Sequence, residues 1–261
     1  MDLVQKTIFS SVGHRFSRFI VFCARNTRLV ATMTVAVMLS TTIIHPANAI
    51  AAAAGPAAPA KARIMVFGDS LSAAYGLNPV DGWVSLMEKS LKNRGISVVN
   101  ASISGETTRG GLTRIKGDLQ RQKPTIVLIA LGANDALRGL PVAETRKNLD
   151  AIINAVRAAN ARPVIIGIQI PPNYGLDYTK SFSDVFPALA KQYKTPLVPF
   201  LLDGIAEKLE LFQADRLHPI AAAQPRILEN VMPGVEQALK LKSGMEKDIK
   251  MTGITATYKQ K

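Results

Sequence analysis

The sequence predicts a single three-layer α/β/α domain built on a five-stranded parallel sheet. Three observations support this fold class. Short apolar runs rich in β-branched residues alternate with longer segments of helical periodicity. The run over residues 125–131 is apolar throughout, as expected of a central strand covered on both faces. No internal repeat breaks the alternation, which implies right-handed crossovers and helices on both faces of the sheet.

The elements follow in order from Arg63. Strands are expected over 64–67, 96–101, 125–131, 163–168 and 196–200. The first two helices present inward-facing apolar side chains at Trp83, Leu86, Met87 and Leu91, and then at Leu112, Ile115 and Leu119. A long helix over 142–160 carries the stripe Leu149, Ile152, Ile153 and Val156.

The remaining helices are interrupted by proline. A helix over 182–193 tolerates Pro187 only with a kink or a break. Further helices are expected after Asp203 and over 221–241, where Pro233-Gly234 favours two short helices as much as one. Residues 242–261 are polar and weakly periodic, so we expect a frayed tail after a domain spanning 63–241.

Residues 1–49 have the features of a secretory signal peptide. A basic region precedes the uncharged apolar run 29–44, and Ala47-Asn48-Ala49 fits a cleavage site after Ala49. The apolar run is short for a membrane span, so a periplasmic or secreted mature protein is expected. A start at Met33 and a mitochondrial transit peptide are the alternatives. Residues 50–62, rich in Ala and Pro, are predicted to be a flexible linker.

Removal of the signal would simplify the chemistry of the chain. Cys23, His14 and His45 would be lost, which leaves no thiol and one imidazole, that of His218. A zinc site needs three or four such ligands, so no metal is expected. The net charge would fall from +13 to +9, because five cations and one anion are removed. This excess favours solubility or weak association with an anionic lipid surface.

Neither a nucleic-acid motif nor a glycine-rich phosphate loop is present, so we expect no nucleic acid and no cofactor. The protein is expected to be a monomer that acts on a small molecule.

Ser70 is the first candidate for chemistry, because it follows a buried strand that ends at Gly68-Asp69. Ligands of open α/β sheets bind at this carboxyl edge, which makes Ser70 a candidate nucleophile. The simpler alternative is that Asp69 or Ser70 only caps the next segment.

His218 is the only candidate general base. Asp215, three residues earlier, can accept the Nδ1–H of its ring and leave Nε2 free to take a proton from a serine. The alternative is a surface histidine beside an aspartate that caps a helix.

Two further loops at this edge offer donors for an oxyanion. Gly105 allows close approach of its backbone N–H, and Asn134 can donate from its side-chain amide. With the N–H of Ser70 they would form an oxyanion hole. Taken singly, each residue is better explained as a turn residue; the coincidence of four such loops favours an active site.

Four segments together resemble the blocks of the GDSL/SGNH hydrolase family. They are Gly68-Asp69-Ser70-Leu71-Ser72, Ser104-Gly105, Gly132-Ala133-Asn134-Asp135 and Asp215-Arg216-Leu217-His218-Pro219. The resemblance covers about Arg63 to Leu239 and is strongest to the members that act on aryl esters, acyl-CoA thioesters and lysophospholipids. It implies a flavodoxin-like sheet order, a catalytic triad of Ser70, Asp215 and His218, and an oxyanion hole of Ser70, Gly105 and Asn134.

The acyl groove is less well specified. Leu77, Leu137, Leu140, Pro172 and Tyr174 are the candidate lining residues, and ordinary loop packing explains each equally well. The resemblance places a mobile loop over 136–141, where Ala136 replaces a usual glycine and restricts the backbone.

Other functions remain open at this point. A carbohydrate O-acetyl esterase uses the same four blocks. A peptidase is a weaker alternative, because amide hydrolysis also requires protonation of the leaving group. A non-catalytic acyl- or lipid-binding module belongs to a different class.

Overall fold

The computed structural model describes residues 62–251. The predicted signal peptide, nearly all of the predicted linker, and residues 252–261 of the predicted tail lie outside this range. Within the described range, no helix is both long and apolar enough to cross a membrane.

The sheet has five parallel strands in the order β2-β1-β3-β4-β5, which confirms the predicted fold class. The strands are β1 (Arg63–Gly68), β2 (Ser97–Asn100), β3 (Ile126–Ala130), β4 (Arg162–Ile166) and β5 (Leu197–Val198). In register, Ile64 pairs with Ile126 and Gly68 with Ala130. The chain order reverses on either side of β1, so the carboxyl ends of β1 and β3 flank the usual ligand position of such sheets.

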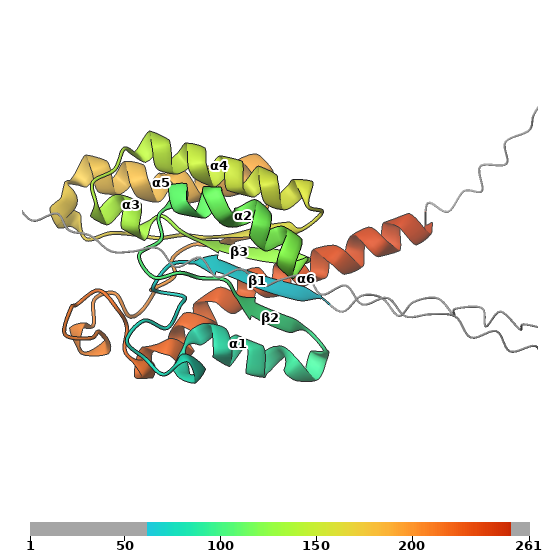
Figure 1. The fold of residues 1–261 in the computed structure, drawn as a ribbon, viewed down its shortest axis with the longest axis horizontal. Coiled ribbons are helices and arrows are strands. Elements are labelled where there is room, and N and C mark those ends of the chain that lie inside the picture. The colour runs from blue at the N-terminus through green and yellow to red at the C-terminus, as the bar shows by residue number, and fades with distance from the viewer. Residues whose placement is uncertain (1–61, 252–261) are drawn as a thin grey trace, which may run out of the picture. The chain divides into compact units, whose positions relative to one another are not determined.

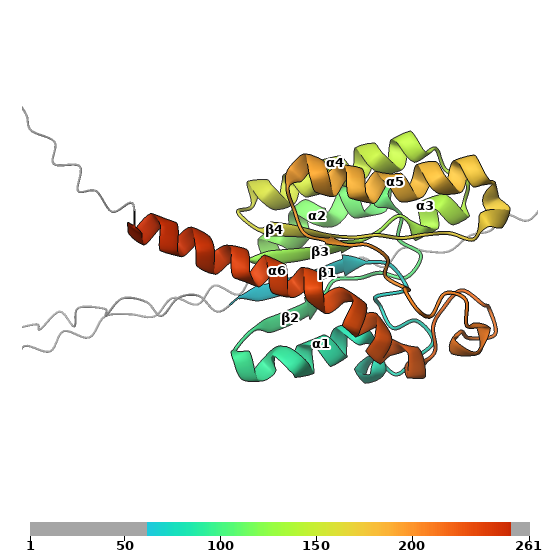
Figure 2. The same cartoon turned by 180° about the vertical axis from the view of Figure 1, so that it is seen from behind.

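Helices cover both faces of the sheet (Figure 1). They are α1 (Trp83–Leu91), α2 (Thr108–Gln122), α3 (Ala133–Leu137), α4 (Val142–Ala158), α5 (Leu176–Tyr193) and α6 (Gln224–Met251). Helices α2, α4 and α5 lie on one face, and α1 and α6 lie on the other, where α6 crosses the sheet (Figure 2).

The alternation of side chains along β1 explains the two layers. Met65 and Phe67 pack into the core shared with α2, α4 and α5, whereas Ile64 and Val66 pack into the core shared with α1 and α6. Every residue of β3 is buried, which accounts for its uninterrupted apolar sequence.

Close contacts set the helices on this sheet. The Thr107 side chain caps α2 by accepting the N–H of Gly110. A Cβ on Gly111 would lie 2.5 Å from a methyl group of Leu131, so a side chain at position 111 of α2 would force the residue after β3 to move. On the other face, the Trp83 indole donates to the carbonyl of Leu71 at 3.1 Å and ties α1 to the turn after β1.

The two proline-containing helices are longer than predicted. Helix α5 begins at Leu176, earlier than predicted, and passes through Pro187 without a break. Helix α6 passes through Pro233 as one helix and continues to Met251, beyond the predicted end at Leu241. Each proline removes one backbone hydrogen bond. Buried neighbours hold both helices against the sheet despite this loss; they are Phe182, Val185, Phe186 and Leu189 in α5, and Val231 and Val235 in α6.

The helix predicted after Asp203 is absent. This segment consists of turns and a 3-10 turn at Leu209–Leu211. Gly204 has a φ of 75°, which a right-handed helix does not allow. Strand β5 is also shorter than predicted, with two residues.

Candidate active site

Ser70 lies in a tight turn at the end of β1. The carbonyl of Asp69 accepts the N–H groups of Ser72 at 3.1 Å and Ala73 at 3.0 Å. A Cβ on Gly68 would meet the Ser72 hydroxyl at 2.8 Å, so the turn needs glycine there. The Asp69 side chain caps the turn through the N–H of Leu71 at 3.1 Å. Asp69 is therefore the residue that caps the turn, whereas the Ser70 hydroxyl makes its hydrogen bond elsewhere.

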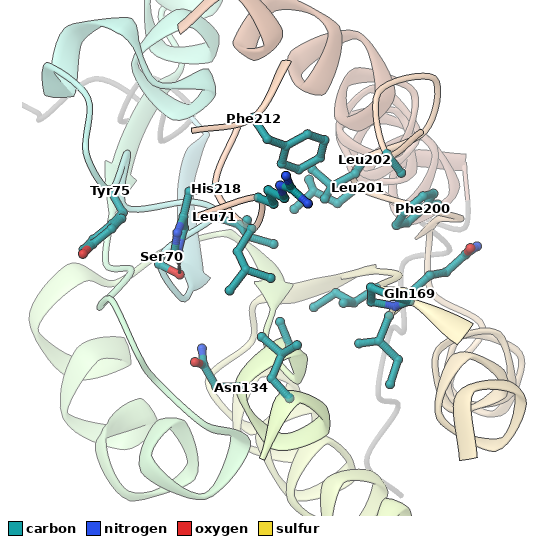
Figure 3. A pocket seen from close by; sticks show the side chains of 18 of the residues that line it. Ser70, Leu71, Tyr75, Asn134, Gln169, Phe200, Leu201, Leu202, Phe212 and His218 are labelled. Atoms are coloured by element: carbon teal, nitrogen blue, oxygen red, sulfur yellow. Dashed lines mark hydrogen bonds between the residues drawn. The ribbon is translucent and has the colours of Figure 1, made fainter. Parts of the chain in front are cut away.

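That partner is His218, which the sequence separates from Ser70 by most of the domain. Ser70 Oγ lies 2.8 Å from His218 Nε2 (Figure 3). On the other side of the ring, His218 Nδ1 lies 2.7 Å from Asp215 Oδ2. With Nδ1 protonated and bonded to the carboxylate, Nε2 is free to accept the serine proton. The three side chains form one hydrogen-bonded chain from hydroxyl to carboxylate.

Local bonds fix the Asp215 carboxylate. Its Oδ1 accepts the backbone N–H groups of Leu217 at 2.9 Å and His218 at 3.0 Å. Arg216 has a φ of 57°, which folds the chain back so that both bonds form within three residues. The hydrogen bond from His218, followed by these backbone donors, lowers the pKa of Asp215 to about 2. The carboxylate therefore stays ionised at neutral pH and can balance a positive charge on the imidazole.

The two predicted oxyanion residues lie at the same cavity as Ser70. Gly105 has a φ of 77°, in the loop between β2 and α2, and lines the cavity together with Asn134 of α3. Asn134 Nδ2 donates to the carbonyl of Glu106 at 3.0 Å and to Asp69 Oδ2 at 3.4 Å. These two acceptors fix the amide, and the longer bond is the one that a substrate oxyanion would more readily replace.

The Asp69 carboxyl is 1% exposed, and its burial raises its pKa to about 7, with the Asp135 carboxylate adding to the rise. The unfolded chain releases this proton near pH 3.8, so the folded state holds more protons between about pH 4 and 7. The contribution of this group to stability is therefore fully present below pH 3.8 and is lost as the pH rises through 7.

We expect Asp69→Asn to remove this loss of stability. The amide oxygen can still accept the N–H of Leu71, but the side chain no longer titrates. Urea unfolding of both proteins at pH 4, 5, 6, 7 and 8 measures the effect. The wild-type free energy of unfolding should fall relative to that of the variant across this range. Parallel curves for the two proteins would contradict the assignment.

A mainly apolar cavity of about 530 Å³ opens beside Ser70. Of the five predicted groove residues, Leu137 and Pro172 line this cavity. The other three, Leu77, Leu140 and Tyr174, are not among its lining residues. The chain turns at Gly76 before Leu77, while Leu140 and Tyr174 face solvent.

Most of the apolar residues that line this cavity were not predicted from the sequence. They include Ile168 and Ile170 after β4. They also include Phe200, Leu201 and Leu202 after β5 (Figure 3). Their positions just beyond strand ends were an available signal, because such residues gather at one edge of a parallel sheet.

Ala136 lies in a helix and not, as expected, at the start of the mobile loop. It lies inside α3, is fully buried and has an ordinary helical backbone, so alanine imposes no strain there. The loop begins at Arg138 and keeps a positive φ of 64° at Gly139.

Among the described residues, no group of three or more His, Cys, Asp or Glu side chains could hold a metal ion.

Ser70, His218 and Asp215 form a hydrogen-bonded chain of hydroxyl, imidazole and carboxylate at the carboxyl edge of a parallel sheet, beside an apolar cavity. This arrangement is characteristic of the serine esterases. Comparison with known families agrees: residues 66–224 match the model of the GDSL-like Lipase/Acylhydrolase family. The chain belongs to this family and is an esterase or thioesterase of the GDSL (SGNH) type.

The alignments with known proteins span most of the length of each relative. Esterase TesA of Pseudomonas aeruginosa is 48% identical over 178 residues, which are 67% of this chain and 89% of the relative. Thioesterase 1/protease 1/lysophospholipase L1 of Escherichia coli K12 is 40% identical over 166 residues, 64% of this chain and 79% of the relative. The crystal structure of the psychrotrophic esterase EstA from Pseudoalteromonas sp., inhibited by monoethylphosphonate, has 42% identity and a TM-score of 0.65, covering 68% and 98% of the two chains.

Proposed function

We propose that Ser70, His218 and Asp215 form a catalytic triad that hydrolyses carboxylic esters and thioesters of medium to long acyl chains. The single observation that carries the proposal is the continuous hydrogen-bonded chain from Ser70 Oγ through His218 to Asp215, opening on the apolar cavity. The names of the relatives, which include esterase, thioesterase and lysophospholipase, support this substrate class.

In the proposed reaction, His218 Nε2 takes the proton of Ser70 as Oγ attacks the acyl carbon. The N–H groups of Ser70 and Gly105 and the Asn134 amide stabilise the negative oxygen of the tetrahedral intermediate. The intermediate collapses to an acyl-serine, and the alcohol or thiol leaves with the proton from His218. Water then attacks the acyl-serine with His218 again as base, which releases the acid and restores Ser70.

The length of the acyl chain tests the substrate class. We expect hydrolysis of p-nitrophenyl esters to be fastest for medium-length chains, because an apolar cavity of about 530 Å³ gains more from several buried methylene groups than from one methyl group. The measurement is kcat/KM from acetate to palmitate. An optimum at acetate would favour a carbohydrate O-acetyl esterase instead. Fatty-acid binding with no turnover of any ester would favour a binding module.

Asn134→Ala tests the proposed oxyanion hole. Loss of one such donor is expected to lower kcat on the order of 10²-fold with little change in KM, because the donor acts mainly on the charge that develops in the transition state. Steady-state kinetics with p-nitrophenyl butyrate measure the effect. Asn154→Ala, on the outer surface of α4, is the matched control and should retain normal turnover. Near-normal kcat in Asn134→Ala would remove Asn134 from the mechanism.

We also propose that the enzyme is exported after cleavage behind Ala49, on the basis of the amino-terminal sequence pattern. Amino-terminal sequencing of the exported protein tests this. A mature chain that begins near Met1 would exclude the cleavage.

A further inference from the structure

His218 and Asp215 lie on a short hairpin over 211–220, which is held together by its own bonds. The N–H of Gln213 donates to the carbonyl of His218 at 2.8 Å, and the N–H of Ile220 donates to that of Leu211 at 2.8 Å. These bonds fix the shape of the hairpin. They do not by themselves fix its position relative to Ser70, which also depends on the packing of Leu211 against the core and on contacts between the hairpin and the turn after β1.

The side chain of Gln213 makes such a contact. Its Nε2 donates to the carbonyl of Tyr75 at 2.8 Å, and also reaches the carbonyl of Pro219 at 3.3 Å. Tyr75 belongs to the turn that begins with Ser70, and its own N–H donates to the Ser70 carbonyl at 3.4 Å. Within residues 62–251, this amide makes the only hydrogen bond between the hairpin and segment 70–77 besides the one between Ser70 and His218.

The backbone beside this amide is shaped to receive it. Gly76 has a φ of 72°, and a Cβ at this position would lie 2.1 Å from Gln213 Oε1. A side chain at position 76 would therefore displace the amide. The glycine and the glutamine fit together as one contact between the two segments.

The same contact holds an aromatic ring against the imidazole. The ring centroids of Tyr75 and His218 are 4.4 Å apart, with the planes tilted by 40°. Figure 3 shows Tyr75 and His218 on the same side of the cavity, with Ser70 beside them. Because Gln213 bonds to the backbone of Tyr75, it restrains both the turn and the residue that packs on the catalytic ring.

We propose that Gln213 is a positioning residue that sets the distance between Ser70 Oγ and His218 Nε2 by joining the hairpin to the nucleophile turn. The inference rests on the proposed triad. Gln213 is not among the residues that line the cavity, and its side chain bonds to the carbonyls of Tyr75 and Pro219, so it acts through the backbone of Tyr75. Its loss should impair proton transfer and attack while leaving the apolar cavity and substrate affinity intact.

Gln213→Glu is the sharpest test, because the side chain keeps its shape but presents an oxygen to the Tyr75 carbonyl in place of a donor. Gln213→Met removes the donor without adding a charge and serves if the first variant fails to fold. Gln120→Glu, exposed on α2, introduces the same charge far from the site and is the matched control. All are measured as the full-length mature protein with p-nitrophenyl butyrate.

We expect kcat to fall about tenfold or more in both Gln213 variants, with KM within about twofold, because a small misplacement of catalytic groups costs this much. The rate of Ser70 labelling by a fluorophosphonate should fall by the same factor, with a melting temperature close to that of Gln120→Glu. The inference is overturned if kcat per fluorophosphonate-titrated site matches the control, because Gln213 would then affect only the amount of folded enzyme. It is also overturned if KM alone changes.

The failure of this inference differs from failure of the triad. If the Gln213 variants keep the kcat of the control while Ser70→Ala is inactive, only the positioning role is excluded. An active Ser70→Ala variant would remove the triad itself, whatever the Gln213 variants do.

Discussion

Ser70→Ala should lower kcat for ester hydrolysis on the order of 10⁶-fold, since loss of the nucleophile of a serine hydrolase has an effect of this size. The hydroxyl lies 2.8 Å from His218 Nε2, and the sequence offers no cysteine within the described residues to replace it. The residual rate should come from the oxyanion donors and the cavity, which the substitution leaves in place.

The measurement is turnover of p-nitrophenyl butyrate, with fluorophosphonate labelling as a second readout. Ser90→Ala, exposed on α1, is the matched control and should label and turn over normally. Ser70→Ala should not label and should unfold at a similar temperature. Stoichiometric labelling of this variant would identify a different nucleophile and refute the assignment.

Asp215→Asn should lower kcat on the order of 10⁴-fold at neutral pH, with the cavity unchanged. The carboxylate accepts the Nδ1–H of His218 at 2.7 Å, and its low pKa of about 2 keeps it ionised. An amide lacks the negative charge that stabilises the imidazolium. It also allows the tautomer in which Nε2 carries the proton and cannot accept one from Ser70.

The test is kcat and kcat/KM for p-nitrophenyl butyrate, with Asp177→Asn in the first turn of α5 as the control. The control should retain wild-type turnover. If Asp215→Asn stays within tenfold of wild type, the carboxylate does not orient the imidazole, and the triad reduces to a serine–histidine pair.

The sequence predicted the strands and the proposed catalytic side chains because their signals are local. Strand β1 followed by Gly68-Asp69-Ser70 indicates a buried strand and a sharp turn, whatever the rest of the chain does. The three-residue spacing of Asp215 and His218 similarly indicates a pair that can bond within one turn.

The predictions failed where distant packing decides the outcome. For Pro233 the sequence favoured one helix and two equally, and for Pro187 it favoured a kink or a break; burial of the neighbouring side chains keeps α5 and α6 continuous. The acyl cavity was only partly predicted. Its wall combines residues after β3, β4 and β5, and although the strand ends indicate the edge of the sheet, no local pattern gives the direction of each side chain. The contact of Gln213 with Tyr75 joins positions 138 residues apart and left no local signal.

The hairpin that carries Asp215 and His218 has a consequence for how the enzyme fails on heating. Asp215 and His218 share one exposed loop whose hydrogen bonds are largely internal and which reaches the turn of Ser70 through two bonds, while Ser70 itself follows the buried strand β1. An exposed loop with few buried contacts opens at lower free energy than the sheet does. Thermal inactivation should therefore begin as a reversible loosening of one loop, with the pair still intact, before the core melts.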